Sequence, residues 1–166
     1  MAGLSFYTVD ERYIDYLAPY APHLFHNAKK GQGHSRKYIG IVLEVNGFEY
    51  FAPLSSFKEK HRRMKNGLDF IKVGDYAVIN LNCMFPVATD TYQRVDFSAV
   101  QDKRYRDLLQ AEYRIIKQLE GRIRKNASTL YNHKANNGDS TPLSARCNDF
   151  SLLERACQGF RYPTHG

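Results

Sequence analysis

The chain has 166 residues, a formal net charge of +7, and 43% hydrophobic and 25% charged residues. This composition is typical of a soluble globular protein, and the length is most simply one domain over residues 1–166. No run of about 18 apolar residues is present, which excludes a membrane-spanning helix. The first residues, MAGLSFYTVDERYIDYL, lack the basic start and apolar stretch of a secretory signal, so we expect a cytoplasmic protein.

The excess of positive charge is accompanied by 12 Tyr and 10 Phe residues. Cations with many amphipathic rings suit a polyanionic partner, and nucleic acid is the first one predicted. Cys83, Cys147 and Cys157 are scattered and form no Cys-x-x-Cys pattern, so we predict reduced cysteines in the core. The six histidines show no metal-ligand spacing either. We therefore expect neither a metal nor another cofactor.

The N-terminal part of the chain predicts a strand and then a short helix. Residues 6–9 (FYTV) have the β-branched and aromatic content of a strand. Asp10 can cap the following helix, in which Tyr13, Ile14 and Leu17 recur at helical spacing until Pro19 and Pro22 end it. Residues 23–37 then combine two glycines with four cations and no acid, which predicts a mobile basic loop. These four cations are Lys29, Lys30, Arg36 and Lys37.

The clearest local pattern is a β-hairpin. Residues 37–45 (KYIGIVLEV) and 48–54 (FEYFAPL) are rich in β-branched and aromatic residues, and Asn46-Gly47 between them is the favoured pair for a two-residue turn. Pro53 lacks an N–H group and is tolerated in a strand only at an edge or a bulge. Two further strands are predicted, over residues 75–81 (DYAVINL) and 91–97 (TYQRVDF).

From Asp102 the apolar period becomes helical, which predicts a long helix near residues 102–125. This span holds eight Lys or Arg against four Asp or Glu, so its exposed face is expected to be basic. After a turn-rich stretch, a last helix is predicted to be capped by Asn148 or Asp149 and to stop at Gly159. Together the elements predict an α+β domain, in which helices pack on a compact, strongly bent antiparallel sheet or partial barrel.

The segment APLSSFK (52–58) ends the second hairpin strand with two hydroxyls and a lysine. Cleaving RNA without a metal requires that the ribose 2′-hydroxyl is oriented and loses its proton. The charge on the phosphate must also be neutralised, and the departing 5′-oxygen must gain a proton. Hydroxyls and cations can meet these needs when one cation loses its proton readily, which neighbouring positive charge favours. Ser55, Ser56 and Lys58 are therefore candidate catalytic residues.

Each candidate also has a plain structural interpretation. The segment could be a Ser-rich turn that enters a solvated basic helix, and its Ser-x-x-Lys spacing also occurs in serine acyl-enzymes, whose partner motifs this chain lacks. Arg36 and Lys37 could simply flank a strand. Tyr13 could be a core residue, although its hydroxyl could also bind a phosphate or its ring stack on a base. His61 could act as an acid or base, or be a solvated surface residue.

Four segments, FYTVDERYIDYL, RKYIGIVLEVNGFEYFAPLSSFK, VINLNCMFPV and CNDFSLLE, share an order and spacing with one known family. In these segments, and over nearly its full length, the chain resembles the ToxN/AbiQ endoribonucleases of type III toxin–antitoxin systems. The resemblance implies a fold similar to the MazF/Kid toxins and metal-independent cleavage of RNA, leaving 2′,3′-cyclic phosphate and 5′-hydroxyl ends. It also implies a role in phage abortive infection or growth arrest.

The resemblance further implies the partners and the site. A small repeat-derived antitoxin RNA, processed by the toxin, would inhibit it by binding as a pseudoknot in a closed RNA–protein complex, and cellular or phage RNA would be the substrate. Ser55 stands where some relatives have Thr, which keeps a hydroxyl. The basic residue before the first hairpin strand falls by count on Arg36, with Lys37 adjacent. The implied catalytic residues are Tyr13, Arg36, Lys37, Ser55, Ser56 and Lys58.

We expect the antitoxin RNA to lie in a groove formed by three basic segments: the 29–37 loop, the 58–65 run and the basic face of the long helix. A non-catalytic RNA-binding protein using the same groove is the main alternative, because a catalytic site can be lost while the fold persists. A DNA-binding protein is disfavoured, because no pair of helices joined by a short turn is evident. The predicted RNA contacts are Lys29, Lys30, His61, Arg62, Arg63, Lys65, Arg122 and Lys125.

Overall fold

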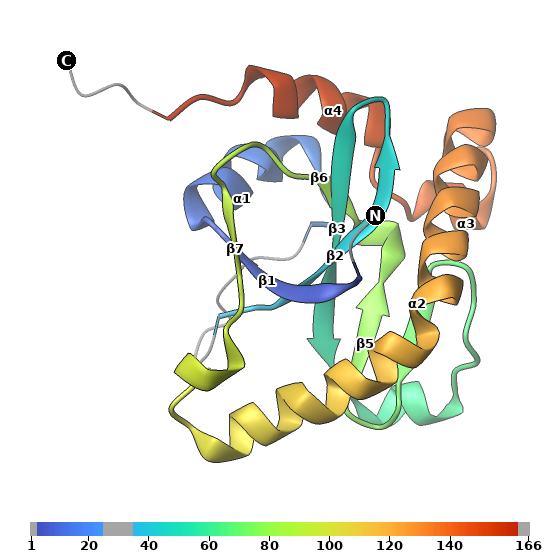
Figure 1. Ribbon diagram of the computed structural model, residues 1–166. Coiled ribbons are helices and arrows are strands. Elements are labelled where there is room, and N and C mark those ends of the chain that lie inside the picture. The colour runs from blue at the N-terminus through green and yellow to red at the C-terminus, as the bar shows by residue number, and fades with distance from the viewer. Residues whose placement is uncertain (1–2, 25–34, 163–166) are drawn as a thin grey trace.

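The computed structural model describes residues 3–24 and 35–162. Within them, seven strands form an antiparallel sheet in the order β4-β5-β3-β2-β1-β7, with β6 pairing to β3 (Figure 1). The strands are β1 Ser5–Val9, β2 Tyr38–Val45, β3 Phe48–Ser56, β4 Phe70–Val73, β5 Ala77–Asn80, β6 Phe85–Pro86 and β7 Tyr92–Arg94. The α-helices are α1 Glu11–Leu17, α2 Lys103–Asn137, α3 Pro142–Ala145 and α4 Phe150–Gly159. The 3₁₀-helices are η1 Ala18–Tyr20, η2 Glu59–Arg63, η3 Leu81–Cys83 and η4 Phe97–Ala99.

The two faces of the bent sheet bury different helices, because successive side chains of a strand point to opposite faces. On β3, Tyr50, Ala52 and Leu54 belong to the core cluster that includes the buried face of α2. Phe51 belongs to a second cluster, built with the buried side chains of α1 and α4. The predicted α+β class with a bent antiparallel sheet is therefore confirmed. No described helix combines the length and the apolar composition that crossing a membrane would need.

The β2–β3 hairpin is confirmed in detail. Asn46 and Gly47 both have positive φ angles, 53° and 79°, as a two-residue turn that matches the twist of its strands requires. The turn fixes the register as far as Leu43, a β-bulge between Gly40 and Leu43 then shifts it, and beyond the bulge Tyr38 lies opposite Pro53. The hairpin therefore determines which residues of β2 face the end of β3, where the candidate catalytic residues lie.

The sequence predicts Pro53 at an edge or a bulge, and the structure places it on a strand with neighbours on both sides. The N–H of Leu54 donates to the Lys37 carbonyl at 3.0 Å and so points toward β2. Since successive N–H groups of a strand alternate in direction, the nitrogen of Pro53 points to the opposite side. On that side, pairing with β6 ends at Phe51 and pairing with β5 begins at Leu54. Pro53 therefore lies between the end of the β6 pairing and the start of the β5 pairing, where neither strand needs its N–H.

The long helix is correctly predicted at its start and too short at its end. The Asp102 side chain accepts the N–H of Tyr105 at 3.2 Å and caps α2, but the helix continues to Asn137 instead of stopping near residue 125. The buried face extends beyond Ile123 through Ala127 and Leu130, which the apolar spacing of larger residues did not reveal. In Figure 1 the first part of α2 passes below the sheet and the second part rises beside it.

The remaining elements divide between confirmed and missed predictions. Asp10 caps α1 by accepting the N–H of Arg12 at 2.9 Å. Of the two candidates for the cap of α4, Asp149 is the residue used, because it accepts the N–H of Leu152 at 3.1 Å. The short strands β4 and β6 were not predicted, and the predicted strand over 75–81 is confined to β5. The three cysteines are buried and unpaired, as expected.

Gly40 gives a prediction about stability. It lies opposite Phe51, and a Cβ atom at this position would overlap the Phe51 ring, which is fully buried and contacts the rings of Tyr7 and Tyr92. We expect Gly40→Ala to lower the free energy of unfolding by about 1–3 kcal/mol, the usual cost of overpacking a core. Urea denaturation measures this cost. Gly121→Ala in α2 is the control, because its added methyl group meets no atom within 4 Å, and equal losses would contradict the prediction.

Candidate active site

The candidate site is built on the last residues of β3. Ser55 and Ser56 pair with Val78 and Ala77 of β5, so the backbone beneath both hydroxyls is fixed by the sheet. Ser55 is half-buried, and its Oγ accepts a hydrogen bond from the Asn80 side chain at 3.0 Å. Ser56 is exposed at the end of the strand. Of the two hydroxyls, the Ser56 hydroxyl is therefore the more accessible to a bound RNA.

Arg36, two residues before β2, reaches the same end of β3. Its Nη1 donates to the Leu54 carbonyl at 3.0 Å, one residue before Ser55. The hairpin register, extended by one residue pair beyond Lys37 and Leu54, places Arg36 opposite Ser55. Partial burial lowers the pKa of Arg36 from its usual high value, but a guanidinium stays charged in proteins. The structure therefore brings a positive charge beside Ser55.

Lys37 extends to the other face of the sheet. Its Nζ donates to the Ser35 carbonyl at 3.0 Å and lies 5.3 Å from the centre of the Tyr105 ring on α2. Burial lowers the pKa of Lys37. Arg36 contacts the Leu54 carbonyl whereas Lys37 lies over Tyr105, so the two side chains are directed to different environments. The geometry favours Arg36 over Lys37 as the partner of the Ser55 hydroxyl.

Lys58 is exposed and directly follows the strand end. Its backbone is extended, with φ −115° and ψ 161°, and it caps η2. The backbone N–H of Phe57 donates to the Tyr76 carbonyl at 3.4 Å, which continues the sheet pairing up to the residue before Lys58. The lysine is thus attached to a well-ordered part of the backbone although its side chain reaches solvent.

Tyr13 has a different place from the one predicted for a nucleotide contact. Its side chain is fully buried between α1, β6 and α4, and its hydroxyl donates to the Pro86 carbonyl at 2.5 Å. The ring also contacts Phe160 edge to face. Burial is the main cause that raises the pKa of the Tyr13 hydroxyl. The core interpretation of its helical spacing is therefore the one that the structure bears out.

The basic run after Lys58 is exposed except for His61. His61 retains only 7% of its surface and is a packed residue instead of a solvated one. Arg62 lies against acids, with Nε 3.2 Å from Glu59 and Nη1 3.8 Å from Asp75. Arg63 and Lys65 are exposed. This part of the predicted RNA surface therefore consists of exposed cations around one buried histidine.

The other predicted RNA contacts lie further along the chain. Arg122 and Lys125 are exposed on α2, close in sequence to Asn126, which donates to the Gly67 carbonyl at 3.4 Å. That contact joins this part of α2 to the segment that follows η2. Lys29 and Lys30, with most of the predicted basic loop, lie outside the described residues.

In this region the sequence prediction missed Asn80, and it named His61 only as an RNA contact or a possible acid or base. Asn80 ends β5, whose pairing with β3 places it near Ser55; the polar end of the strand AVIN was the available sign. His61 stands three residues after Lys58, the spacing of a helix cap partner. Because cations surround it in the sequence, its burial was not predicted. Within residues 3–24 and 35–162, no three His, Cys, Asp or Glu side chains form a group that could hold a metal ion.

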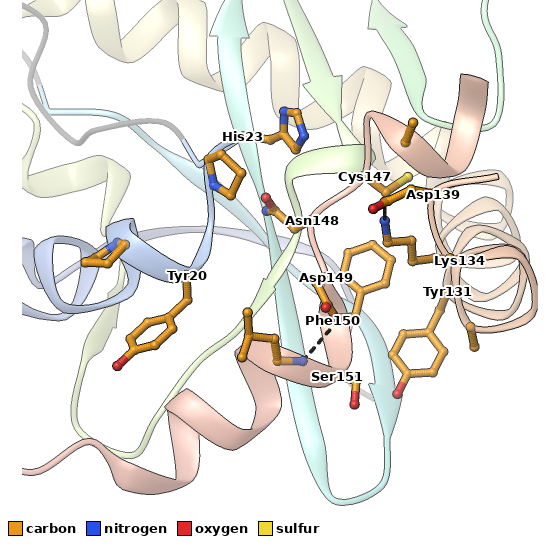
Figure 2. Close-up of a pocket in the computed structure, with 16 residues that line it drawn as sticks. Tyr20, His23, Tyr131, Lys134, Asp139, Cys147, Asn148, Asp149, Phe150 and Ser151 are labelled. Carbon is orange, nitrogen blue, oxygen red and sulfur yellow. Dashed lines mark hydrogen bonds and ion pairs between the residues drawn. The ribbon is translucent and has the colours of Figure 1, made fainter. Parts of the chain in front are cut away.

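A separate hollow of about 790 Å³ lies between η1, the C-terminal part of α2 and the start of α4 (Figure 2). Its walls include Tyr20, Tyr131 and Phe150. Lys134 at its margin pairs with Asp139 at 2.7 Å. None of the six predicted catalytic residues lines this hollow. The end of β3 is therefore the candidate site, because four of those residues meet there.

Comparison with known proteins agrees with this fold. A family model described as "Toxin ToxN, type III toxin-antitoxin system" matches residues 5–158. The protein named "Endoribonuclease ToxN" from Pectobacterium atrosepticum is 28% identical over 165 residues, which cover 95% of this chain and 94% of that protein.

Two solved structures are also similar over almost their whole length. One, described as "A processed non-coding RNA regulates a bacterial antiviral system", has a TM-score of 0.83 and 27% identity, covering 94% of this chain and 98% of its own. The other concerns "selective toxin inhibition by a non-coding RNA pseudoknot" and has a TM-score of 0.81 and 27% identity, covering 95% of this chain and 97% of its own. With a family model that spans most of its residues, this chain belongs to the ToxN toxin family of type III toxin–antitoxin systems.

Proposed function

We propose that this chain is an endoribonuclease toxin that cleaves RNA by transesterification, without a metal. The observation that carries the proposal is the meeting of Arg36, Ser55, Ser56 and Lys58 at the end of β3. Curated relatives that match most of the chain are named endoribonucleases. A set of cations and hydroxyls is suited to a phosphodiester, because it supplies donors and positive charge to the oxygens of the phosphate.

In the proposed reaction the ribose 2′-oxygen attacks the adjacent phosphorus. The new O2′–P bond replaces the P–O5′ bond, the 2′-hydroxyl loses its proton, and the departing 5′-oxygen gains one. The products carry a 2′,3′-cyclic phosphate and a 5′-hydroxyl. Ser56, supported by Ser55, orients the 2′-hydroxyl or the phosphate, while Lys58 and Arg36 neutralise charge that develops on the phosphate oxygens. Tyr13 is not assigned an RNA contact, because its hydroxyl faces the core.

The proposed inhibitor is a small repeat-derived RNA that the enzyme itself processes and that folds as a pseudoknot. One similar solved structure concerns toxin inhibition by a non-coding RNA pseudoknot, and another concerns a processed non-coding RNA. We place this RNA along the exposed cations of the 59–65 segment and the basic face of α2, where phosphate contacts supply most of the affinity. In this proposal the 166 residues act as one MazF/Kid-like domain in the cytoplasm, and the substrates are cellular or phage RNA.

The first test is whether purified protein cuts RNA when no metal is available. We expect the cleavage rate to change by less than about twofold in excess EDTA, because the proposed charge stabilisation comes from side chains and not from a bound ion. The substrate is a short unstructured RNA, so that its own folding does not depend on magnesium. Loss of cleavage in EDTA that magnesium restores would contradict the proposed chemistry.

The product ends test the reaction itself. Polynucleotide kinase should label the new 5′ ends without prior phosphatase treatment, because they carry hydroxyls. A protein that shifts RNA in a gel but never cuts it would support the alternative, a non-catalytic RNA-binding protein. Lys58→Ala provides the matched control for contaminating nucleases.

A further inference from the structure

His61 is the one buried side chain in an otherwise exposed basic segment. Its neighbours Lys60, Arg62 and Arg63 are exposed, whereas His61 retains 7% of its surface. The imidazole lies between two aromatic rings, with centroids 5.6 Å from Phe57 and 5.4 Å from Phe70. Phe57 belongs to the end of the catalytic segment and Phe70 to β4. The packing therefore attaches the histidine to the sheet.

Two hydrogen bonds join His61 to Lys58. The backbone N–H of Lys58 donates to Nδ1 of the imidazole at 2.7 Å. In return, the backbone N–H of His61 donates to the Lys58 carbonyl at 2.9 Å. The peptide groups on both sides of the Lys58 Cα are thus held by one residue. Because the direction of a side chain follows from the backbone around its Cα, these contacts fix the direction in which the lysine side chain leaves the backbone.

The contact with Nδ1 also specifies the protonation state of His61. A ring nitrogen that accepts a hydrogen bond carries no proton, so the proton of the neutral ring lies on Nε2. Burial lowers the pKa of His61, and the positive charges of Lys60 and Lys58 beside it and of Lys72 on β4 lower the pKa further. The environment therefore favours the neutral form that the contact needs.

We propose that His61, through its unprotonated Nδ1, is a positioning residue that holds Lys58 in place for RNA cleavage. The inference rests on the proposed function, since it assigns His61 a role only through Lys58. Protonation of Nδ1 would replace the acceptor by a donor and set it against the Lys58 N–H. Cleavage should therefore fall as the pH falls through the pKa of His61, which burial and the neighbouring lysines lower from its ordinary value.

Two variants separate the acceptor from the packing. His61→Phe keeps an aromatic ring between Phe57 and Phe70 but removes the acceptor. His61→Asn offers an amide oxygen near the position of Nδ1 and does not titrate. We expect His61→Phe to lower kcat on a short RNA by about tenfold or more, with KM nearly unchanged, because the groups that act on the transition state need close positioning. His61→Asn should recover most of the rate and lose the acidic decline.

The decisive comparison repeats the substitution in a Lys58→Ala background. If His61 acts through Lys58, His61→Phe should cause little further loss there, as expected for coupled residues. An equal loss in both backgrounds, or a wild-type kcat for His61→Phe, would overturn the inference. If His61→Phe does not fold, as shown by circular dichroism, the pH profile decides: an acidic decline that persists in His61→Asn overturns the proposal.

The same experiment separates this inference from the proposed function. A Lys58→Ala variant that cleaves at the wild-type rate would overturn both. An inactive Lys58→Ala variant together with a fully active His61→Phe variant would overturn only the role of His61. The wild-type protein, purified from its complex with the antitoxin RNA, is the reference throughout.

Discussion

Lys58→Ala should lower RNA cleavage by about 100-fold or more while leaving the protein folded and able to bind its antitoxin RNA. Catalysis concentrates its free energy on the few groups that meet the developing charge, and removal of one oxyanion donor costs about 2.7–4 kcal/mol in a comparable case. Binding is spread over many exposed cations, each contributing about 1 kcal/mol or less. The two losses should therefore differ by orders of magnitude.

The measurement pairs growth arrest after induction without antitoxin with a gel shift on the purified variant. Lys65→Ala is the matched control, because Lys65 is an exposed cation of the same segment that is not proposed to act in catalysis. Lys58→Ala should grow normally and still shift the RNA, whereas Lys65→Ala should remain toxic. If Lys58→Ala stays fully toxic, the end of β3 is only a turn and the reaction takes place elsewhere.

The hairpin that carries the site could be predicted because its signals are local. Asn46-Gly47 specifies the turn, and the apolar residues on either side specify the strands. The short strands β4 and β6 could not be predicted in the same way. They have four and two residues, and their extended conformation depends on pairing with β5 and β3. A strand that short has too few residues for its alternation to be recognised.

The site residues also differ in whether local sequence or distant contacts determine their position. The chain places Ser55, Ser56 and Lys58 together because they are neighbours in sequence, and the hairpin register adds Arg36. The burial of Tyr13 depends on Pro86 and Phe160, which are distant in sequence. The burial of His61 depends on Phe70, which arrives on another strand. Local charge patterns suggested exposure for His61, and tertiary packing overrode them.

The sequence leaves open whether Arg36 or Lys37 contacts the scissile phosphate, and the structure shows different surroundings for the two side chains. Arg36 holds the Leu54 carbonyl at 3.0 Å and lies opposite Ser55 in the hairpin register. Lys37 points to the face covered by α2, with its ammonium over the Tyr105 ring. A phosphate bound at the Ser55 hydroxyl would therefore lie on the side of Arg36.

Arg36→Ala should accordingly lower kcat/KM by about 10- to 100-fold, and Lys37→Ala by about threefold or less, because only the first removes a charge aimed at the phosphate. Arg36→Lys should lie between them, since an ammonium keeps the charge but cannot reproduce the planar fork of a guanidinium. Single-turnover cleavage of a short RNA measures all three, and thermal melts show whether each variant is folded. A larger loss for Lys37→Ala than for Arg36→Ala would place the scissile phosphate on the α2 side of the sheet, away from Ser55.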